Sequence, residues 1–242
     1  MTNKNIYPST PKVTGILMLI TCLFVTFLIT ANIIGVKLIT IESTLPGLLK
    51  GPHTLPAAIA VFPITYILGD VLTEVYGFKF ARRVIFLAFF CNAAAVSIFL
   101  IGELLPPASF WNGQPAYETI LGNTPRLLAA SFLAFLVGEF SNSLILSRLK
   151  LLTNGRWLWM RTIFSTIVGQ GIDSAIFISL AFLNTIPDNQ ILNLITTQWT
   201  IKVAYEVLAT PLTYLIVIFL KKHEELDVYD WGLSLNPLKA LS

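Results

Sequence analysis

The chain has 242 residues, of which 55% are hydrophobic and only 12% are charged. Soluble domains carry about 25% charged residues, so this composition excludes an ordinary soluble protein and predicts an integral membrane protein. The formal net charge of +3 is modest, and no basic run indicates a nucleic-acid surface. Two cysteines within apolar runs and two distant histidines predict neither a disulfide framework nor a metal site.

Six apolar segments are long enough to cross a bilayer, which takes about 20 residues per helix. The first segment is too long for a signal-peptide core and is expected to stay in the protein. The last is long for one span, and Pro211 is expected to kink or divide it. None of the runs alternates as a strand does. We therefore predict an all-α, polytopic membrane protein with six transmembrane helices, at roughly 13–34, 55–76, 84–105, 126–147, 162–183 and 191–220.

Basic residues are distributed unequally between the two sets of loops. They precede the first span, follow the second, separate the fourth from the fifth and follow the sixth, whereas the other side carries only Lys37, Lys50 and Arg126. This bias predicts cytoplasmic N and C termini. We expect a cytoplasmic tail over residues 1–12, a transmembrane domain over 13–220, and a solvated cytoplasmic tail over 221–242.

Two outer loops have unusual sequences. Residues 35–54 alternate weakly around Lys37, which favours a hairpin or a re-entrant segment. Residues 106–125 hold Trp111 and Tyr117, and such aromatics suit the headgroup region. Both segments are equally consistent with simple connecting loops that carry interface anchors.

Ionisable residues within the spans are the strongest functional signal. A charge at mid-bilayer costs at least about 2.5–3.5 kcal/mol, so several of them require a reason. Their three- and four-residue spacing places each set on one helix face, which we expect to point inward. Counted from the loops, the sets sample the whole depth of the membrane, as a transport pathway requires. The polar residues are Asn32, Asp70, Glu74, Glu139, Asn142, Gln170, Asp173, Gln198, Lys202 and Glu206.

Structural and enzymatic alternatives remain open at this point. Lys202 and Glu206 could form a structural ion pair, Glu74 could be an interfacial carboxylate, and Asn32 could bridge helices. An integral membrane enzyme could use the buried carboxylates. However, the sequence contains neither an H-E-x-x-H metal motif nor a Walker A motif, so metalloprotease and ATPase activities are not indicated.

Four segments resemble the signature sequences of the queuosine precursor transporter family, also called the vitamin uptake transporter family: ANIIGVK, FPITYILGDVLTEVYGFKFARR, GQGIDSAIF and IKVAYEVLATPLTY. The resemblance covers about residues 15–220, and FP-x-TY-x₃-D-x₃-E-x-YG is its most specific element. It implies a bacterial inner-membrane importer, rather than an enzyme, for 7-cyano-7-deazaguanine or related bases that supply tRNA modification. It implies no cofactor. A membrane substrate-binding subunit for another vitamin-like compound is the alternative.

Such a ligand suits the buried polar residues. A deazaguanine edge carries N1–H, an exocyclic amine and a carbonyl, and one carboxylate can accept both protons while an amide or ammonium donates to the carbonyl. Asp173 or Glu206 fits the first role, and Gln170 or Lys202 fits the second. An aromatic side chain could stack on the flat ring; the candidates are Phe62, Tyr66 and Tyr205.

The two carboxylates of the most specific motif have separate expected roles. Glu74 is expected to hold a cytoplasmic gate, with Arg82 or Arg83 as its partner, and Asp70 either joins the ligand site or carries a coupling proton. A homodimer is compatible with the sequence, but nothing in it requires one. The expected partners are the base and the bilayer, without nucleic acid. The candidate substrate-binding residues are Asn32, Lys37, Phe62, Tyr66, Asp70, Glu74, Gln170, Asp173, Lys202, Tyr205 and Glu206.

Overall fold

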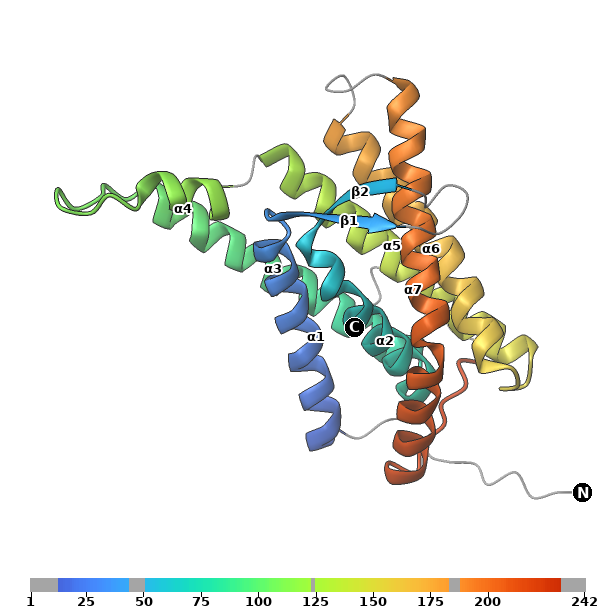
Figure 1. The fold of residues 1–242 in the computed structure, drawn as a ribbon. Helices are drawn as coiled ribbons and strands as arrows, with labels where there is room; N and C mark the ends of the chain where they lie inside the picture. Colours follow the sequence, from blue (N-terminus) through green and yellow to red (C-terminus); the bar gives the residue numbers. More distant parts are fainter. Residues whose placement is uncertain (1–12, 44–50, 123–124, 183–187, 232–242) are drawn as a thin grey trace, which may run out of the picture.

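The computed structural model describes residues 13–43, 51–122, 125–182 and 188–231 (Figure 1). The expected tail over 1–12, the end of the tail over 232–242, and the loop cations Lys4, Lys12, Lys50 and Lys239 lie outside these residues. The helices and strands, in chain order, are α1 (Gly15–Ile34), β1 (Leu38–Ser43), β2 (Gly51–Pro56), α2 (Phe62–Val71), α3 (Phe78–Leu104), α4 (Gln114–Leu121), α5 (Pro125–Leu152), α6 (Leu158–Phe182) and α7 (Asp188–His223).

Five helices in the described part of the chain are long and apolar enough to cross a membrane: Gly15–Ile34, Phe78–Leu104, Ala129–Leu152, Leu158–Phe182 and Ile191–His223. The protein is therefore a helical, multi-pass membrane protein, as predicted. These helices correspond to the first, third, fourth, fifth and sixth predicted spans. The division expected at Pro211 does not occur, because α7 continues through this proline to His223.

The second predicted span, 55–76, is not one long helix. It consists of a 3₁₀ turn, η2 (Ala57–Ala60), the α-helix α2, and a π-helical segment, η3 (Leu72–Tyr76). The 10 residues of α2 extend about 15 Å, half of the roughly 30 Å hydrocarbon core. Gly77 ends the segment with a φ of 86°, which favours glycine. Apolar length alone predicted a span here because it does not register such interruptions.

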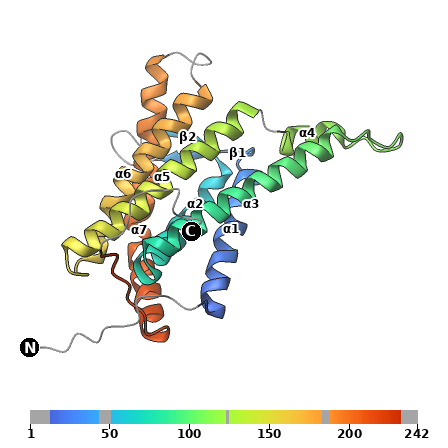
Figure 2. The same cartoon turned by 180° about the vertical axis from the view of Figure 1, so that it is seen from behind.

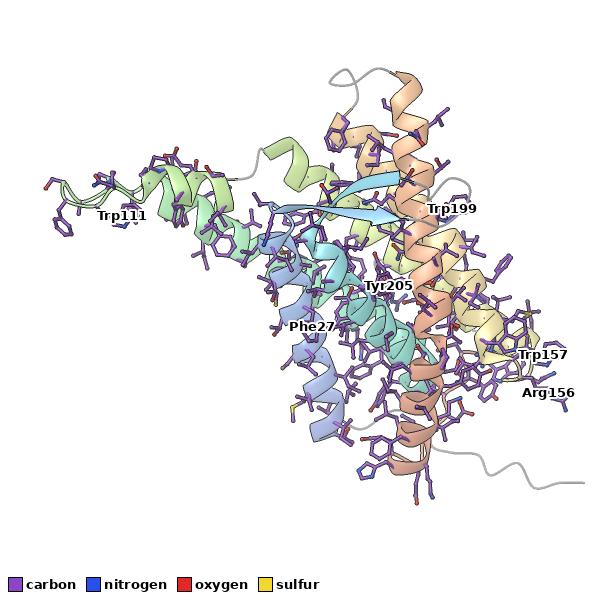
Figure 3. All side chains as sticks on the ribbon, in the orientation of Figure 1. Phe27, Trp111, Arg156, Trp157, Trp199 and Tyr205 are labelled. Carbon is purple, nitrogen blue, oxygen red and sulfur yellow. The ribbon has the colours of Figure 1, made fainter. Side chains whose placement is uncertain are left out.

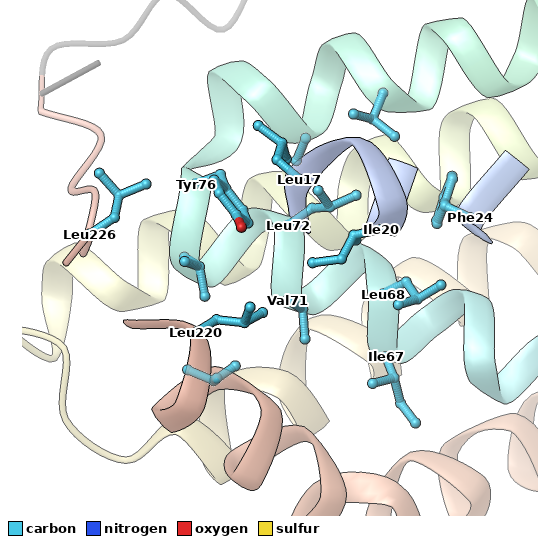
Figure 4. Close-up of a cluster of buried hydrophobic side chains, with 14 of the residues drawn as sticks. Leu17, Ile20, Phe24, Ile67, Leu68, Val71, Leu72, Tyr76, Leu220 and Leu226 are labelled. Carbon is cyan, nitrogen blue, oxygen red and sulfur yellow. The ribbon is translucent and has the colours of Figure 1, made fainter. Parts of the chain in front are cut away.

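The segment formed by α2 and η3 lies at the centre of the bundle. Every residue from 65 to 78 is buried. Val71, Leu72 and Val75 pack against Leu17 and Phe24 of α1, with further apolar side chains from α3 and α7 (Figure 4). Because protein surrounds it, this short segment can carry polar side chains that lipid would not tolerate.

Helices α5 and α6 approach each other closely at two glycines. A Cβ atom on Gly138 would lie 2.6 Å from Cβ of Asp173, and one on Gly169 would lie 2.6 Å from Cβ of Asn142. Small residues permit such close helix contacts in membranes. The contact brings Asn142 of α5 against the backbone of α6 and Asp173 of α6 against the backbone of α5.

The hairpin expectation for residues 35–54 is met in the part that the structure describes. Strands β1 and β2 are antiparallel, with Leu38 opposite Pro56 and Ser43 opposite Gly51. The Ala57 amide donates to the Lys37 carbonyl at 2.7 Å, so the hairpin closes directly before η2.

The second half of α3 and the short helix α4 project from the bundle in both views (Figures 1 and 2). The hydroxyl of Tyr117 on α4 donates to the Phe99 carbonyl on α3 at 3.0 Å, which joins the two helices. Trp111 lies at the outer part of this projection (Figure 3) and is 45% exposed.

The chain folds back after α7. Leu226 is buried in the main apolar core, and Thr14 donates a hydrogen bond to Glu224 at 3.0 Å, so the start of α1 lies beside the end of α7. The expectation that the tail is simply solvated therefore does not hold for Leu226 and Asp230, which are both buried.

Candidate functional site

A pocket lies between α2 and α7, near the N-terminal end of α2. The rings of Phe62 and Tyr66, one helical turn apart, are nearly parallel, with an interplanar angle of 8° and centroids 6.1 Å apart. The empty space measures about 430 Å³, including the part that opens outward. Its lining residues are Ile59, Phe62, Pro63, Tyr66, Gln198, Ile201, Lys202 and Tyr205.

Lys202 carries the positive charge of this pocket. Its ammonium forms an ion pair with Asp173 on α6, and the Lys202 and Asp173 side chains are only 10% and 17% exposed. The same ammonium lies 5.8 Å from the centroid of the Phe62 ring and 6.0 Å from that of Tyr66. A cation at this distance from aromatic rings is attracted to them. One side chain thus connects the aromatic wall to the carboxylate on α6.

Helix α6 is joined to α7 beside this ion pair. The indole N–H of Trp199 donates to the Ile167 carbonyl at 2.8 Å, and the indole ring lies against Gly171. Trp199 and Tyr205 can be followed along α7 in Figure 3. Gln170 is buried one turn before Asp173, and its Oε1 has no hydrogen-bond partner among the described residues. An amide in this position can bind a ligand without first breaking a bond at that oxygen.

Three more buried carboxyl groups lie behind the pocket. Asp70 on α2 accepts a hydrogen bond from the Asn142 side chain on α5 at 2.8 Å. Glu139, one turn before Asn142, lies against Gly69, where a Cβ would come within 2.2 Å of its Oε1. Glu206 on α7 is 2% exposed. Electrostatic interactions connect Asp70 with both glutamates, so the three groups share one neighbourhood.

A second polar cluster surrounds Glu74 in η3. Arg161 on α6 donates to both carboxylate oxygens, Lys221 on α7 donates to Oε1 at 2.6 Å, and Lys150 on α5 lies 3.6 Å from Oε1. The Glu74 side chain is 1% exposed. We call Glu74, Lys150, Arg161 and Lys221 the basal ion cluster. Three cations around one carboxylate keep it ionised despite its burial.

The segment that follows α7 covers the basal ion cluster. Asp227 binds both Lys150 at 2.6 Å and Lys221 at 2.9 Å. Burial alone would raise the pKa of Asp227, but the two ammonium groups outweigh it and hold the pKa below its ordinary value. Asp230 accepts from the amide of Phe78 at 2.8 Å and from the hydroxyl of Ser147 at 2.6 Å. Residues 226–230 therefore fasten α3, α5 and α7 together.

The geometry offers no obvious metal centre. Among the residues that the structure describes, no three or more His, Cys, Asp or Glu side chains are grouped so that they could hold a metal ion.

The family model described as "Putative vitamin uptake transporter" matches residues 56–216. The chain belongs to this family. The matched region contains the whole pocket and the carboxyl groups behind it, whereas Lys221 and Asp227 lie beyond its end. The family resemblance carried by the sequence motifs is thus confirmed.

Three curated relatives have similar sequences. The chain is 34% identical to the "Probable queuosine precursor transporter" of Bacillus subtilis (strain 168) over 147 residues, which are 60% of this chain and 64% of that protein. It is 30% identical to the "Queuosine precursor transporter" of Escherichia coli (strain K12) over 138 residues, 57% of this chain and 59% of that protein. For the "Probable queuosine precursor transporter" of Haemophilus influenzae (strain ATCC 51907 / DSM 11121 / KW20 / Rd), the identity is 27% over 121 residues, 50% and 49% of the two chains.

The matched segments span less than two thirds of the length of these relatives. All three names are those of transporters and none is that of an enzyme, which agrees with the expectation that the chain is not an enzyme. No solved structure matches the chain.

The structure brings most of the candidate binding residues together, but not all of them. Asn32 lies apart and donates to the Asn92 side chain on α3 at 3.0 Å, so it bridges two helices, as the structural alternative held. Lys37 is exposed beside the hairpin. Glu74 belongs to the basal ion cluster rather than to the pocket. Four of the remaining candidates line the pocket: Phe62, Tyr66, Lys202 and Tyr205. Asp173 pairs with Lys202, Asp70 and Glu206 lie behind the pocket, and Gln170 is buried one turn before Asp173.

Two ion pairs differ from the sequence-based hypotheses. Lys202 pairs with Asp173 on the neighbouring helix, not with Glu206 one turn along its own helix. The cations paired with Glu74 come from α5, α6 and α7, whereas the sequence analysis had named Arg82 or Arg83. Lys150 and Arg161 had been counted as loop charges, yet they are 2% and 0% exposed. Their position in the terminal turns of long apolar helices is the one signal that could have marked them.

Proposed function

We propose that this chain imports queuosine precursors across the bacterial inner membrane. The substrates are 7-cyano-7-deazaguanine and related 7-deazaguanine bases, which supply tRNA modification. The family assignment and the names of the relatives support a transporter of this class. The observation that carries the proposal is the pairing of two nearly parallel aromatic rings with the largely buried Asp173–Lys202 ion pair at one pocket.

In the proposed complex, the flat base lies against the rings of Phe62 and Tyr66. Its N1–H and exocyclic amine donate to the carboxylate of Asp173, which has the two acceptor oxygens that such an edge requires. The carbonyl of the base accepts from Lys202 or from the Gln170 amide. A few convergent polar groups within an apolar pocket are the usual form of a small-molecule site.

The proposed membrane arrangement has six crossings with both termini in the cytoplasm. Five long helices alone would leave the two ends on opposite faces. The hydrogen bond from Thr14 to Glu224 instead places the start of α1 beside the end of α7. This supports a role for the η2–α2–η3 segment as the sixth crossing. In this arrangement, we propose that the basal ion cluster forms a cytoplasmic gate.

A binding screen on the purified protein tests the substrate. We expect 7-cyano-7-deazaguanine to raise the melting temperature, since a ligand at 100 times its Kd stabilises the folded state by about 2.7 kcal/mol. Guanine, which has N7 where the ligand has a substituted carbon, and adenine, which presents a different edge, serve as controls. Equal shifts with all three bases, or none with any, would count against a dedicated deazaguanine site.

Transport by the chain alone is then measured in liposomes with the labelled base. Accumulation of the unchanged compound supports an importer that needs no further subunit. A converted product inside the liposomes would support an enzyme instead. Binding without uptake would favour a substrate-binding subunit that requires a separate energy-coupling module.

A further inference from the structure

The part of the described interior that lies around the pocket, apart from the basal ion cluster, holds more acids than bases. Four carboxyl groups, those of Asp70, Glu139, Asp173 and Glu206, share it with the single ammonium of Lys202. Glu139 interacts electrostatically with Asp173, Glu206 and Lys202, and Asp70 interacts with both glutamates. These groups come from α2, α5, α6 and α7, so they form one site and not a run along one helix.

The ammonium of Lys202 already has a partner. Lys202 pairs with Asp173, and this leaves Asp70, Glu139 and Glu206 without a cation in contact in the described structure. Asp70 has the Asn142 amide as a donor to Oδ1. Its Oδ2, Oε1 of Glu139 and Oε1 of Glu206 are buried atoms for which the described residues offer no hydrogen-bond partner. The three side chains are 0%, 3% and 2% exposed.

An ionised carboxylate in such a place is strongly unfavourable unless it is paired, so the resting groups carry protons. Glu74 provides the comparison within the same segment. It lies one turn after Asp70, is equally buried, and is surrounded by Lys150, Arg161 and Lys221. The protein therefore ionises one acid of this segment by supplying cations and leaves the other without them.

We infer that Asp70, Glu139 and Glu206 form a proton-binding site that couples import of the base to entry of a proton. The inference rests on the proposed function, since it specifies what drives uptake through the same pocket. A proton suits these groups, because each has a buried carboxyl oxygen for which the described residues offer no hydrogen-bond partner.

The exchange of partners at Lys202 provides the coupling. In the empty pocket Lys202 is held by Asp173, and Glu206, one turn further along α7, is a neutral carboxylic acid. When the base donates its two protons to Asp173 in hydrogen bonds, the ammonium of Lys202 is released. It then pairs with Glu206 on the same helix face, while the Gln170 amide donates to the carbonyl of the base.

This new pair stabilises the ionised form of Glu206, which releases its proton. The O–H bond of the carboxylic acid breaks, the electron pair stays on the carboxylate, and the proton passes to water on the cytoplasmic side. After the base leaves, Lys202 returns to Asp173. Glu206 then takes a proton from external water, so one proton enters for each base and charge is conserved at every step.

Proteoliposomes with a trapped pH-sensitive dye test this inference with labelled 7-cyano-7-deazaguanine in sodium-free buffer. Two assays run on the same preparation. Counterflow exchange requires no driving force and reports whether the base is transported. Net uptake under an imposed gradient, acidic outside, reports coupling, and for one proton per base we expect about tenfold greater accumulation per pH unit.

The decisive variant is Glu206→Gln, which keeps the shape of the side chain but cannot release a proton in this range. We expect it to lose both internal acidification and the response to the gradient, and we expect any counterflow that it shows to be independent of the pH difference. Glu118→Gln, an exposed acid on α4, is the matched control and should behave as the wild type. Size-exclusion profiles check that both variants are folded.

The possible negative results lead to different conclusions. If the wild-type protein exchanges the base but shows no proton flux and no response to the gradient, the coupling is refuted and the proposed function stands. A Glu206→Gln variant that still follows the gradient would also overturn the inference. If the wild-type protein shows no counterflow, the proposed function itself fails, and the inference fails with it.

Discussion

The ammonium of Lys202 lies within reach of a carboxylate and two aromatic rings. Each contact alone is modest, because a cation near an aromatic ring contributes about 0.5–2 kcal/mol depending on its exposure. Together they hold a long, flexible side chain at one point of the pocket wall. A ligand that engages Asp173 must therefore change the surroundings of Lys202 as well, which links recognition to rearrangement at the level of one residue.

For Asp173→Asn, we expect affinity for the deazaguanine base to fall about 10- to 100-fold. The carboxamide keeps one acceptor oxygen but loses the negative charge, and a hydrogen bond to a charged group contributes about 1.5–3 kcal/mol. Thermal-shift titration gives the affinity, and liposome uptake gives the transport rate. Unchanged binding and uptake by a folded variant would remove Asp173 from the site.

At the scale of elements, glycines decide how near the polar helices come to one another. Gly138 and Gly169 bring α5 and α6 together, and Gly69 lets the carboxyl group of Glu139 reach the backbone of α2. Without these contacts the acids of three helices would remain separated by side chains. The glycines thus act on the site by setting distances between elements.

The substitution Gly69→Ala tests this role. Its Cβ would lie 2.2 Å from Oε1 of Glu139, so either the helix or the carboxyl group must move, at a cost of about 1–3 kcal/mol. We expect a lower melting temperature and reduced uptake. Gly15→Ala is the control, because nothing lies within 4 Å of its added methyl group, and it should be neutral or slightly stabilising. Equal behaviour of the two variants would contradict this account.

The difference between local sequence information and tertiary contacts explains what the sequence could predict. Five of the six spans were recognised because apolar length is a property of a segment by itself. The break of the second span into η2, α2 and η3 was not, since it depends on the protein that surrounds it. Helical spacing grouped Asp70 with Glu74, but the structure places the two residues in separate clusters because a π-helical segment begins between them. Such spacing could not pair Lys202 with Asp173, because that choice lies between helices.

Across the whole molecule, residues 226–230 connect parts that are distant in the chain. Asp230 provides the acceptor for the first amide of α3, where Gly77 has no side chain to do so. Asp227 joins the ends of α5 and α7. The charge bias counted Lys150 and Arg161 among the basic residues of the loop between the fourth and fifth spans, whereas both side chains are buried. Counting charges cannot distinguish a loop cation from one that is buried in a pair.

Replacing Asp230 by alanine should destabilise the protein by about 1–2 kcal/mol. The variant leaves the Phe78 amide and the Ser147 hydroxyl without their acceptor, a loss similar to removal of a helix cap. Thermal unfolding in detergent measures the change. Lys222→Ala, at an exposed position in the last turn of α7, should differ little from the wild type. A wild-type melting temperature for Asp230→Ala would show that the segment does not hold the bundle.

Low pH should reduce the stability that the segment over residues 226–230 provides. Because the folded state lowers the pKa of Asp227, its contribution to stability is present above the ordinary value near 3.9 and is lost as the pH falls through the folded value. We therefore expect Asp227→Asn to melt below the wild type at pH 7 and the gap to narrow below about pH 4. A gap that is constant across this range would contradict the assignment.

The position of residues 226–230 also has a consequence for biogenesis. The ribosome makes them after every membrane helix, yet they cap α3 and complete the salt bridges of Lys150 in the middle of the chain. The helices can thus enter the bilayer in order during synthesis, but their final docking must wait until this last stretch emerges. In a nascent chain that is stopped just after α7, the helices would be inserted but not yet docked against one another.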